Sequence, residues 1–140
     1  MALADCIFCK IVAGEIPSAR VYETDQVLAI LDINPVTPGH TLLLAREHVP
    51  SLLEATGEVC SALAEALPQV ARGVVHATGA EGLNVLLNSG RTAGQLIPHL
   101  HLHLIPRRTG DGLHLEWRPR PYREGEMETY RQRISQAIEA

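Results

Sequence analysis

The sequence predicts an α+β fold, with a mainly antiparallel sheet of about five strands, one long helix and a C-terminal helix. Short apolar runs rich in strand-forming residues, each bounded by turn residues, predict the strands. Two stretches with apolar residues every three to four positions predict the helices. Because strands and helices do not alternate regularly, an antiparallel sheet is favoured over a parallel one. No linker divides the 140 residues, so we expect a single domain over residues 1–140.

The first half of the chain carries three predicted strands. Arg20–Glu23 and the apolar run Val27–Leu31 flank a Thr-Asp turn signal, which is typical of a hairpin. Two prolines and a glycine then make residues 32–39 an ordered loop. This loop leads into another short strand over residues 40–45.

The segment between Val49 and Gly79 contains the long amphipathic helix. Its apolar residues recur at helical spacing, and they are Leu63, Leu67, Val70, Val74 and Val75. Pro68 lies inside this pattern, where it lacks a backbone donor and clashes with the preceding turn. We therefore expect either a kink at Pro68 or two shorter helices.

Two further strands and a helix complete the predicted fold. Residues 82–88 predict a strand, and residues 99–105 alternate strictly between histidine and apolar side chains. An Arg- and Pro-rich tail follows from Arg107 to Arg123. The chain then ends in a helix whose apolar stripe comprises Met127, Tyr130, Ile134 and Ile138.

Composition limits the classes of function. Twelve Lys and Arg against sixteen Asp and Glu give a formal net charge of −4, which argues against a nucleic-acid or membrane-surface protein acting through bulk positive charge. With neither a long apolar run nor a signal peptide, the sequence predicts a cytoplasmic protein without nucleic-acid or membrane partners. Three cysteines argue against a disulfide framework, which leaves Cys6 and Cys9 as a metal clip, a redox pair or two inert thiols.

Residues 99–105 hold three of the seven histidines at alternate positions. Side chains alternate across a strand, so we expect His99, His101 and His103 on one face. The plain alternative is a solvent-facing strand that happens to carry histidine. A single metal held by all three is disfavoured, because successive imidazoles on a straight strand lie about 6.6 Å apart and the outer two diverge. We expect the histidine at one end of the segment to ligate a metal ion or to brace the site, while the middle and far histidines take part in the chemical step.

This pattern resembles the signature of the histidine triad (HIT) family, and in particular its bacterial-type nucleoside phosphoramidases. The family comprises nucleotide hydrolases and transferases that act on the α-phosphate. Further segments match family motifs in family order, namely Cys6–Ile11, Asp32–His40, Arg46–His48, Asn88–Gly90 and Ala93–Gln95. The resemblance spans about Cys6 to Arg107, most of the chain.

The resemblance assigns the phosphate end of a catalytic site. The middle histidine, His101, matches the family's nucleophile and would form a covalent nucleotidyl-histidine that water hydrolyses. The loop at Gly94 would supply a backbone carbonyl that fixes the other ring nitrogen of His101. His103 would hydrogen-bond the phosphate oxygens, and His40 would orient or charge-balance the site. The phosphate and leaving-group pocket would be completed by Asn88 and the backbone around Gly94 and Gln95.

The nucleoside end is assigned in the same way. Asp32 would accept hydrogen bonds from the ribose hydroxyls, and the apolar wall for the base would consist of Ile7, Phe8 and Ile11. Leu96 departs from the family pattern, in which a serine or threonine commonly follows the glutamine. Because a leucine cannot donate a hydrogen bond to the phosphate or the leaving group, we expect weaker or differently supported activity on amidates.

For the remaining cysteines and histidines the resemblance implies a structural zinc ion. Its ligands would be Cys6, Cys9, His48 and His99, a set that suits tetrahedral Zn²⁺ and leaves no open position. Spacing alone supports this weakly, since the interval from Cys9 to His48 is much longer than in zinc fingers. A redox pair is disfavoured because no thioredoxin-like βαβ unit surrounds the two cysteines.

The resemblance implies a hydrolase that cleaves the α-phosphate bond of nucleoside phosphoramidates or related nucleotidyl substrates and releases a nucleoside monophosphate. A dinucleoside polyphosphate hydrolase is the alternative within the fold, with specificity set partly by the variable tail over residues 107–140. A purine-nucleotide-binding protein without turnover is the alternative from another class, but it would not require the intact triad. The family also implies a two-fold homodimer, formed through the long helix and the strand at residues 82–88.

Overall fold

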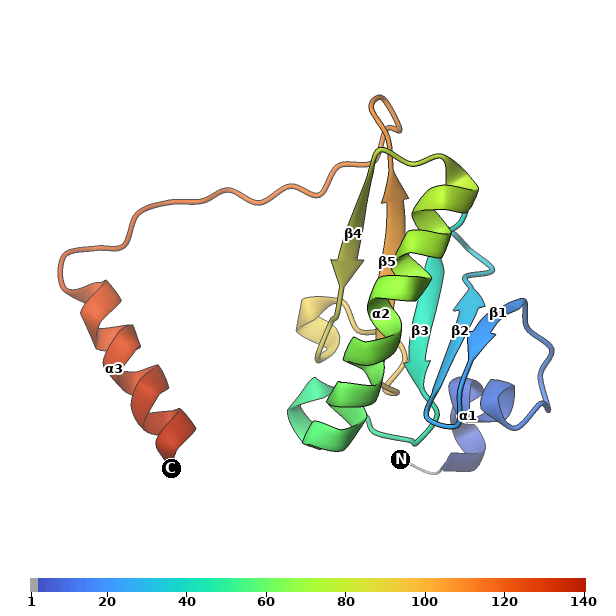
Figure 1. The fold of residues 1–140 in the computed structure, drawn as a ribbon. Coiled ribbons are helices and arrows are strands. Elements are labelled where there is room, and N and C mark those ends of the chain that lie inside the picture. Colours follow the sequence, from blue (N-terminus) through green and yellow to red (C-terminus); the bar gives the residue numbers. More distant parts are fainter. Residues whose placement is uncertain (1–2) are drawn as a thin grey trace.

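The computed structural model describes residues 3–140 (Figure 1). Five strands form one antiparallel sheet in the order β1-β2-β3-β5-β4. The strands are Arg20–Glu23 (β1), Val27–Leu31 (β2), Thr41–Ala45 (β3), Gly82–Leu86 (β4) and His101–Arg107 (β5). The α-helices are Ile7–Val12 (α1), Gly57–Thr78 (α2) and Glu126–Glu139 (α3), and 3-10 turns cover Leu3–Asp5, Leu52–Glu54 and Arg91–Ala93. The predicted α+β class and five-stranded antiparallel sheet are confirmed.

The three central strands, β2, β3 and β5, are buried on both faces of the sheet, and side-chain alternation divides their residues between two cores. On the α2 face the core takes apolar residues from three strands, Val27, Ala29, Leu43, Leu102 and Leu104. On the opposite face α1 packs over the alternate residues, Leu28, Ile30, Leu42 and Leu44. His101 and His103 share this second face because they alternate with Leu102 and Leu104. Since His101 is only 8% exposed, the alternative of a solvent-facing histidine strand is wrong.

α2 is one uninterrupted helix of 22 residues that contains Pro68, so the alternative of two shorter helices is wrong (Figure 1). Thr56 caps its start by accepting a hydrogen bond from the Val59 N–H, and Gly79 ends it in the left-handed conformation. Pro68 is exposed, and so is Ala64, whose carbonyl loses its donor within the helix. Because water can hydrate that carbonyl, the proline costs α2 one hydrogen bond and leaves its continuity intact.

The structure also shifts element boundaries and adds α1. β4 ends at Leu86, and β5 begins at His101, so His99 lies in the segment before the strand. α1 was not predicted, because its six residues are too few to show helical periodicity. The Cys6 sulfur caps this short helix by accepting a hydrogen bond from the Cys9 N–H.

α3 stands apart from the sheet at the end of residues 108–125, a segment without helix or strand (Figure 1). The predicted C-terminal helix is confirmed, but its apolar stripe is at least 45% exposed at every position. None of the helices within residues 3–140 combines the length and the apolar character that crossing a bilayer requires.

Candidate active site and metal centre

A cavity of about 300 Å³ opens on the α1 face of the sheet. It is lined by Phe8, Asp32, Asn34, Leu42, Gly94, Leu96, Ile97, His101 and His103. Phe8 comes from α1, Leu42 from β3, and His101 and His103 from β5. The remaining lining residues come from the loops that precede β3 and β5. The cavity therefore brings together residues that the sequence assigns to the phosphate end and to the nucleoside end of one site.

A backbone carbonyl fixes the ring of His101. Its Nδ1 atom lies 2.7 Å from the carbonyl oxygen of His99. Because a carbonyl only accepts, Nδ1 carries the proton and Nε2 keeps its lone pair, which is the form a nucleophile needs. Burial lowers the pKa of His101 below 6.5 against the opposing effect of the His99 carbonyl, so the ring is neutral at neutral pH.

The prediction that Gly94 supplies this carbonyl is wrong. His99 lies just ahead of β5, where its carbonyl can turn toward the ring two residues further along the chain. Gly94 instead fits the loop by its conformation, since its φ of 97° favours glycine. A Cβ atom there would lie 3.4 Å from the Asn88 amide nitrogen, so the structure brings Asn88 beside this loop.

A directional hydrogen-bond chain connects His40 to His103. The backbone N–H of Val36 donates to Nδ1 of His40 at 3.2 Å, which puts the proton of a neutral His40 on Nε2. That nitrogen lies 3.0 Å from Nδ1 of His103 and donates to it. His103 therefore carries its own proton on Nε2.

Burial keeps both of these rings neutral. It is the main reason why the pKa of His40 lies below 6.5 and why that of His103 falls to about 4. The nearby Asp32 carboxylate opposes the shift in both rings without cancelling it. A neutral His103 that lines the cavity offers an N–H donor to an anionic oxygen without introducing a buried charge.

Asp32 and Phe8, which the resemblance assigns to the nucleoside, both line the cavity. Asp32 accepts a hydrogen bond from the Asn34 N–H at 2.8 Å, and its other oxygen lies 3.8 Å from Nε2 of His40. The Phe8 ring meets the His101 ring edge-on, with centroids 5.0 Å apart.

Ile7 and Ile11 are placed differently from Phe8. Ile11 is buried in the core beneath α1, whereas Ile7 is 43% exposed. Neither belongs to the lining of the cavity as it is described for residues 3–140. Their contact with a base stays a prediction.

The Gln95 side chain is a strut between three loop segments. Its oxygen accepts from the Gly90 N–H at 2.9 Å, and its nitrogen donates to the carbonyls of Pro50 at 2.7 Å and Ile97 at 3.0 Å. The residue is only 7% exposed. Because all three bonds go to backbone, the side chain holds the loops before β5 and after β3 together, and only its backbone is left for the predicted pocket.

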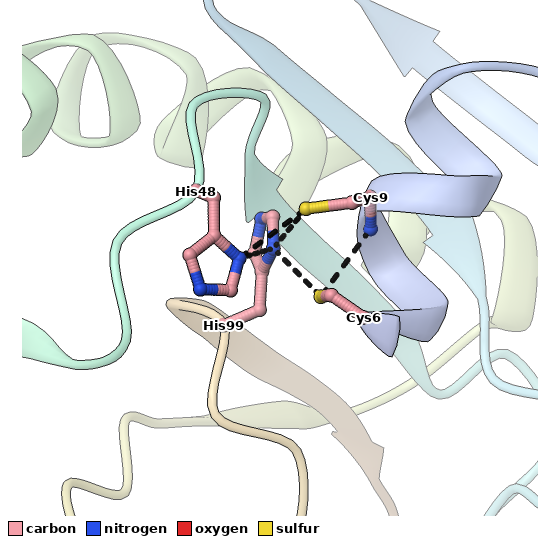
Figure 2. A group of neighbouring side chains, drawn as sticks. All are labelled: Cys6, Cys9, His48 and His99. Atoms are coloured by element: carbon pink, nitrogen blue, oxygen red, sulfur yellow. Dashed lines mark hydrogen bonds between the residues drawn. The ribbon is translucent and has the colours of Figure 1, made fainter. Parts of the chain in front are cut away.

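Cys6, Cys9, His48 and His99 converge at the start of α1 (Figure 2). The Cys6 sulfur lies 3.3 Å from Nδ1 of His99, and the Cys9 sulfur lies 3.2 Å and 3.6 Å from Nδ1 of His48 and His99. The two nitrogens are 3.3 Å apart. A tetrahedral zinc site separates two nitrogens by about 3.3 Å and a nitrogen from a sulfur by about 3.5 Å. These four residues could therefore hold a metal ion.

His99 has the protonation state that a ligand requires. Its Nε2 lies 2.6 Å from the Ala45 carbonyl and carries the proton, so the lone pair of Nδ1 faces the two sulfurs. Burial and the neighbouring Cys6 raise the pKa of the Cys9 thiol to about 11, and a bound dication is what would stabilise its thiolate. We call Cys6, Cys9, His48 and His99 the metal cluster. The side chain of His99 belongs to this cluster, while its backbone carbonyl accepts the hydrogen bond from Nδ1 of His101.

Sequence reasoning missed Asn34, Leu42 and Ile97 in the cavity lining. Leu42 lies opposite His103 in the register of β3 and β5, which places it on the histidine face. The near-uniform apolar run of β3 gives no periodic signal for either face. Asn34 could have been predicted as a site residue, because it belongs to the segment Asp32–His40 that matches a family motif.

The fold and the arrangement of histidines define a protein of the HIT class, and comparison with known proteins agrees. The HIT domain pattern matches residues 13–110. The chain is 47% identical over 115 residues to Protein hit of Bacillus subtilis, which covers 81% of this chain and 79% of that protein. It is 41% identical over 134 residues to the adenosine 5'-monophosphoramidase hnt1 of Schizosaccharomyces pombe, covering 95% and 98% of the two chains. The chain belongs to the HIT family.

Two solved structures extend the comparison. The crystal structure of SMU.412c from Streptococcus mutans superposes with a TM-score of 0.94 at 41% identity, covering 98% of this chain and 87% of that one. A zinc-bound histidine triad family protein from Mycobacterium smegmatis superposes with a TM-score of 0.75 at 36% identity, covering 99% of each chain. These neighbours confirm the HIT fold.

Proposed function

We propose that this protein is a hydrolase that cleaves the α-phosphate bond of nucleoside phosphoramidates through a nucleotidyl-histidine on His101. The observation that carries the proposal is the hydrogen bond from Nδ1 of His101 to the His99 carbonyl. It leaves a neutral, oriented Nε2 atom in a cavity that also holds an N–H donor on His103. The phosphoramidase name of the fission yeast relative supports the same reaction class.

In the first step Nε2 of His101 attacks the α-phosphorus, a P–N bond to the ring forms, and the P–N bond to the leaving amine breaks. The departing amine takes up one proton from solvent, and the water that attacks in the second step gives one proton back to solvent. In the second step water attacks the same phosphorus, the bond to His101 breaks, and a nucleoside monophosphate leaves. The Nε2–H of His103 is placed to hydrogen-bond the non-bridging oxygens while negative charge builds on them.

The other residues divide between substrate binding and support. We assign the ribose hydroxyls to Asp32 and the face of the base to Phe8, since both line the cavity and offer an acceptor carboxylate and an apolar ring. We also assign a structural Zn²⁺ to Cys6, Cys9, His48 and His99, supported by the distances between their ligand atoms and by the zinc-bound mycobacterial relative. Bound there, the ion would tie α1 to the segment that precedes β5.

Two substrates and one variant test the proposal. We expect wild-type protein to release AMP from an adenosine phosphoramidate of lysine faster than from diadenosine triphosphate, and His101→Ala to lose both activities. Faster cleavage of diadenosine triphosphate would instead support the dinucleoside polyphosphate hydrolase. Equal rates for wild type and variant on both substrates would contradict catalysis by His101 and leave a nucleotide-binding protein.

A further inference from the structure

A second cavity, of about 370 Å³, adjoins the cavity that holds His101. We call the two spaces the Arg91 cavity and the His101 cavity. The Arg91 cavity is lined by Gly90, Arg91, Gln95, Leu96 and Pro98. Leu96 also lines the His101 cavity, so its side chain forms a boundary that the two cavities share. A ligand that is bound at His101 and extends past Leu96 therefore enters the Arg91 cavity.

The loop that carries Arg91 is held in place by hydrogen bonds. The backbone N–H groups of Ala93 and Gln95 donate to the Gly90 carbonyl at 3.2 Å and 3.0 Å. The Gly90 N–H donates to the Gln95 side chain at 2.9 Å, and that side chain also ties the loop to the segments after β3 and before β5. The fold thus sets the position of the Arg91 backbone beside the cavity, while the Arg91 side chain is exposed.

The Arg91 guanidinium is available to a ligand. Four other arginines form ion pairs with carboxylates of this chain, namely Arg20, Arg46, Arg107 and Arg131. Arg91 has neither an ion pair nor a side-chain hydrogen bond within the part of the chain that the structure describes, residues 3–140. Its five N–H donors are therefore free to bind an incoming anion.

The two cavities carry opposite charges at different places. Among the residues that line them within the described chain, Arg91 is the single Lys or Arg and Asp32 is the single carboxylate. The proposed function assigns the ribose to Asp32 and the reacting phosphorus to His101, and it leaves the leaving amine without a binding site. The Arg91 cavity offers such a site and supplies it with a positive charge.

The Arg91 cavity is built partly from positions that the family motifs do not fix. Arg91 lies between the matching segments Asn88–Gly90 and Ala93–Gln95. Leu96 stands where family members commonly carry serine or threonine. The guanidinium suits an anion, and the apolar side chains of Leu96 and Pro98 suit a short hydrocarbon chain. The lining therefore fits an amine whose hydrocarbon chain ends in an acid.

We propose that the Arg91 cavity binds the leaving group and that Arg91 selects amines that carry a carboxylate. A guanidinium can donate two parallel N–H bonds to one carboxylate, which gives direction as well as charge. This inference rests on the proposed function, because it specifies the leaving group of the same reaction. Arg91 acts by binding the substrate, and the bonds that form and break at phosphorus are unchanged.

Two substrates that differ only in charge test the selection. They are the adenosine 5'-phosphoramidates of 4-aminobutyrate and of 4-aminobutyramide, in which an amide of the same shape replaces the carboxylate. Because an exposed ion pair is a weak interaction, we expect kcat/KM of the wild-type protein to be about 3- to 5-fold higher for the acid, through a lower KM. Equal values, or a higher value for the amide, would overturn the proposal. Cleavage of neither compound would contradict the proposed function itself, and the inference would fall with it.

Variants at Arg91 assign the preference to this residue. We expect Arg91→Gln to bring the acid-to-amide ratio close to one while the rate on the amide is retained, and Arg91→Glu to invert the ratio. Arg72→Gln removes an exposed positive charge on α2, away from the lining of both cavities, and should keep the wild-type ratio. A wild-type ratio in Arg91→Gln, or an equal loss of the preference in Arg72→Gln, would overturn the proposal.

Discussion

His99 and His101 are two residues apart, yet the structure prepares them for opposite uses. In each ring one nitrogen donates to a backbone carbonyl, Nε2 of His99 to Ala45 and Nδ1 of His101 to His99. The lone pair that remains faces two sulfurs in His99 and the cavity in His101. The position of one carbonyl therefore decides whether a buried histidine is suited to ligate or to attack.

The two regions around these rings differ in their packing as well. The metal cluster joins α1 to the loops after β3 and before β5, so it connects elements of the fold. The residues that line the cavity instead surround a space of about 300 Å³ that a ligand can enter. Changes in the cluster should therefore lower stability first, and changes in the cavity should lower the rate.

The largest expected effect comes from His101→Asn. The asparagine amide can still donate to the His99 carbonyl, but it offers no nucleophilic nitrogen. We expect turnover to fall about 10⁴-fold or more, with zinc content and the midpoint of thermal unfolding nearly unchanged. Steady-state rates, metal analysis and calorimetry on one preparation check this, and a variant that also loses its metal would contradict the separation of the two regions.

Cys9→Ser should show the reverse pattern. Loss of one thiolate weakens a tetrahedral zinc site, and structural zinc contributes directly to folding free energy. We expect zinc content to fall sharply and the unfolding midpoint to drop by about 10 °C, since one kcal/mol shifts a domain of this size by about 2–8 °C. Cys60→Ser, a change at a cysteine outside the cluster, is the control. Unchanged zinc and stability in Cys9→Ser would rule out the assigned ligand set.

Gln95→Glu tests the strut between the loops. A carboxylate keeps the shape of the side chain but cannot donate to the carbonyls of Pro50 and Ile97, so two acceptors lose their partner. We expect kcat to fall about tenfold because the loop at Gly94 loses its position. Gln132→Glu on exposed α3 controls for the added charge. A change in KM alone would instead indicate that Gln95 acts by binding substrate.

The pH dependence follows from the buried neutral rings. The pKa values of His40, His101 and His103 lie below 6.5, with that of His103 at about 4, so the unfolded chain binds more protons than the folded one in this range. Stability should therefore decrease as the pH falls from 6.5 toward 4. Denaturant unfolding at several pH values measures this, and His103→Gln should weaken the dependence. A stability that rises on acidification would contradict the neutral assignment.

The smallest effect is expected from Leu96→Ser. Leu96 is 80% exposed and lines the cavity, so a serine there can present the hydroxyl that family members commonly carry. A single added hydrogen bond of about 0.5–1.5 kcal/mol would raise phosphoramidate turnover roughly 2- to 10-fold. Leu96→Ala separates the gain of a hydroxyl from the loss of the leucine. An equal rate increase in both variants would show that the leucine acts by obstruction.

The sequence could predict what depends on periodicity and local chemistry. The strands and the long helix were recognisable in this way, because periodicity carries them. The four residues of the metal cluster came from the resemblance to the HIT family, since their spacing alone supports a zinc site only weakly. The carbonyl on His101 and the Gln95 strut depend on how loops far apart in the chain turn toward each other, which no local pattern encodes. α1 was too short to predict, and the exposure of the stripe on α3 depends on tertiary packing.

We propose that Nε2 of His101 forms a covalent bond to the substrate phosphorus, and the mechanism depends on this bond. Rapid quenching of wild-type protein with an adenosine phosphoramidate, followed by peptide mass spectrometry under conditions that preserve phosphorus–nitrogen bonds, tests it most directly. We expect an adenylyl group on the peptide that contains residues 99–105, assigned by fragmentation to His101 and absent from His101→Asn. An active enzyme whose adenylyl group lies on another residue, or that releases AMP without any adduct under single-turnover conditions, would contradict it.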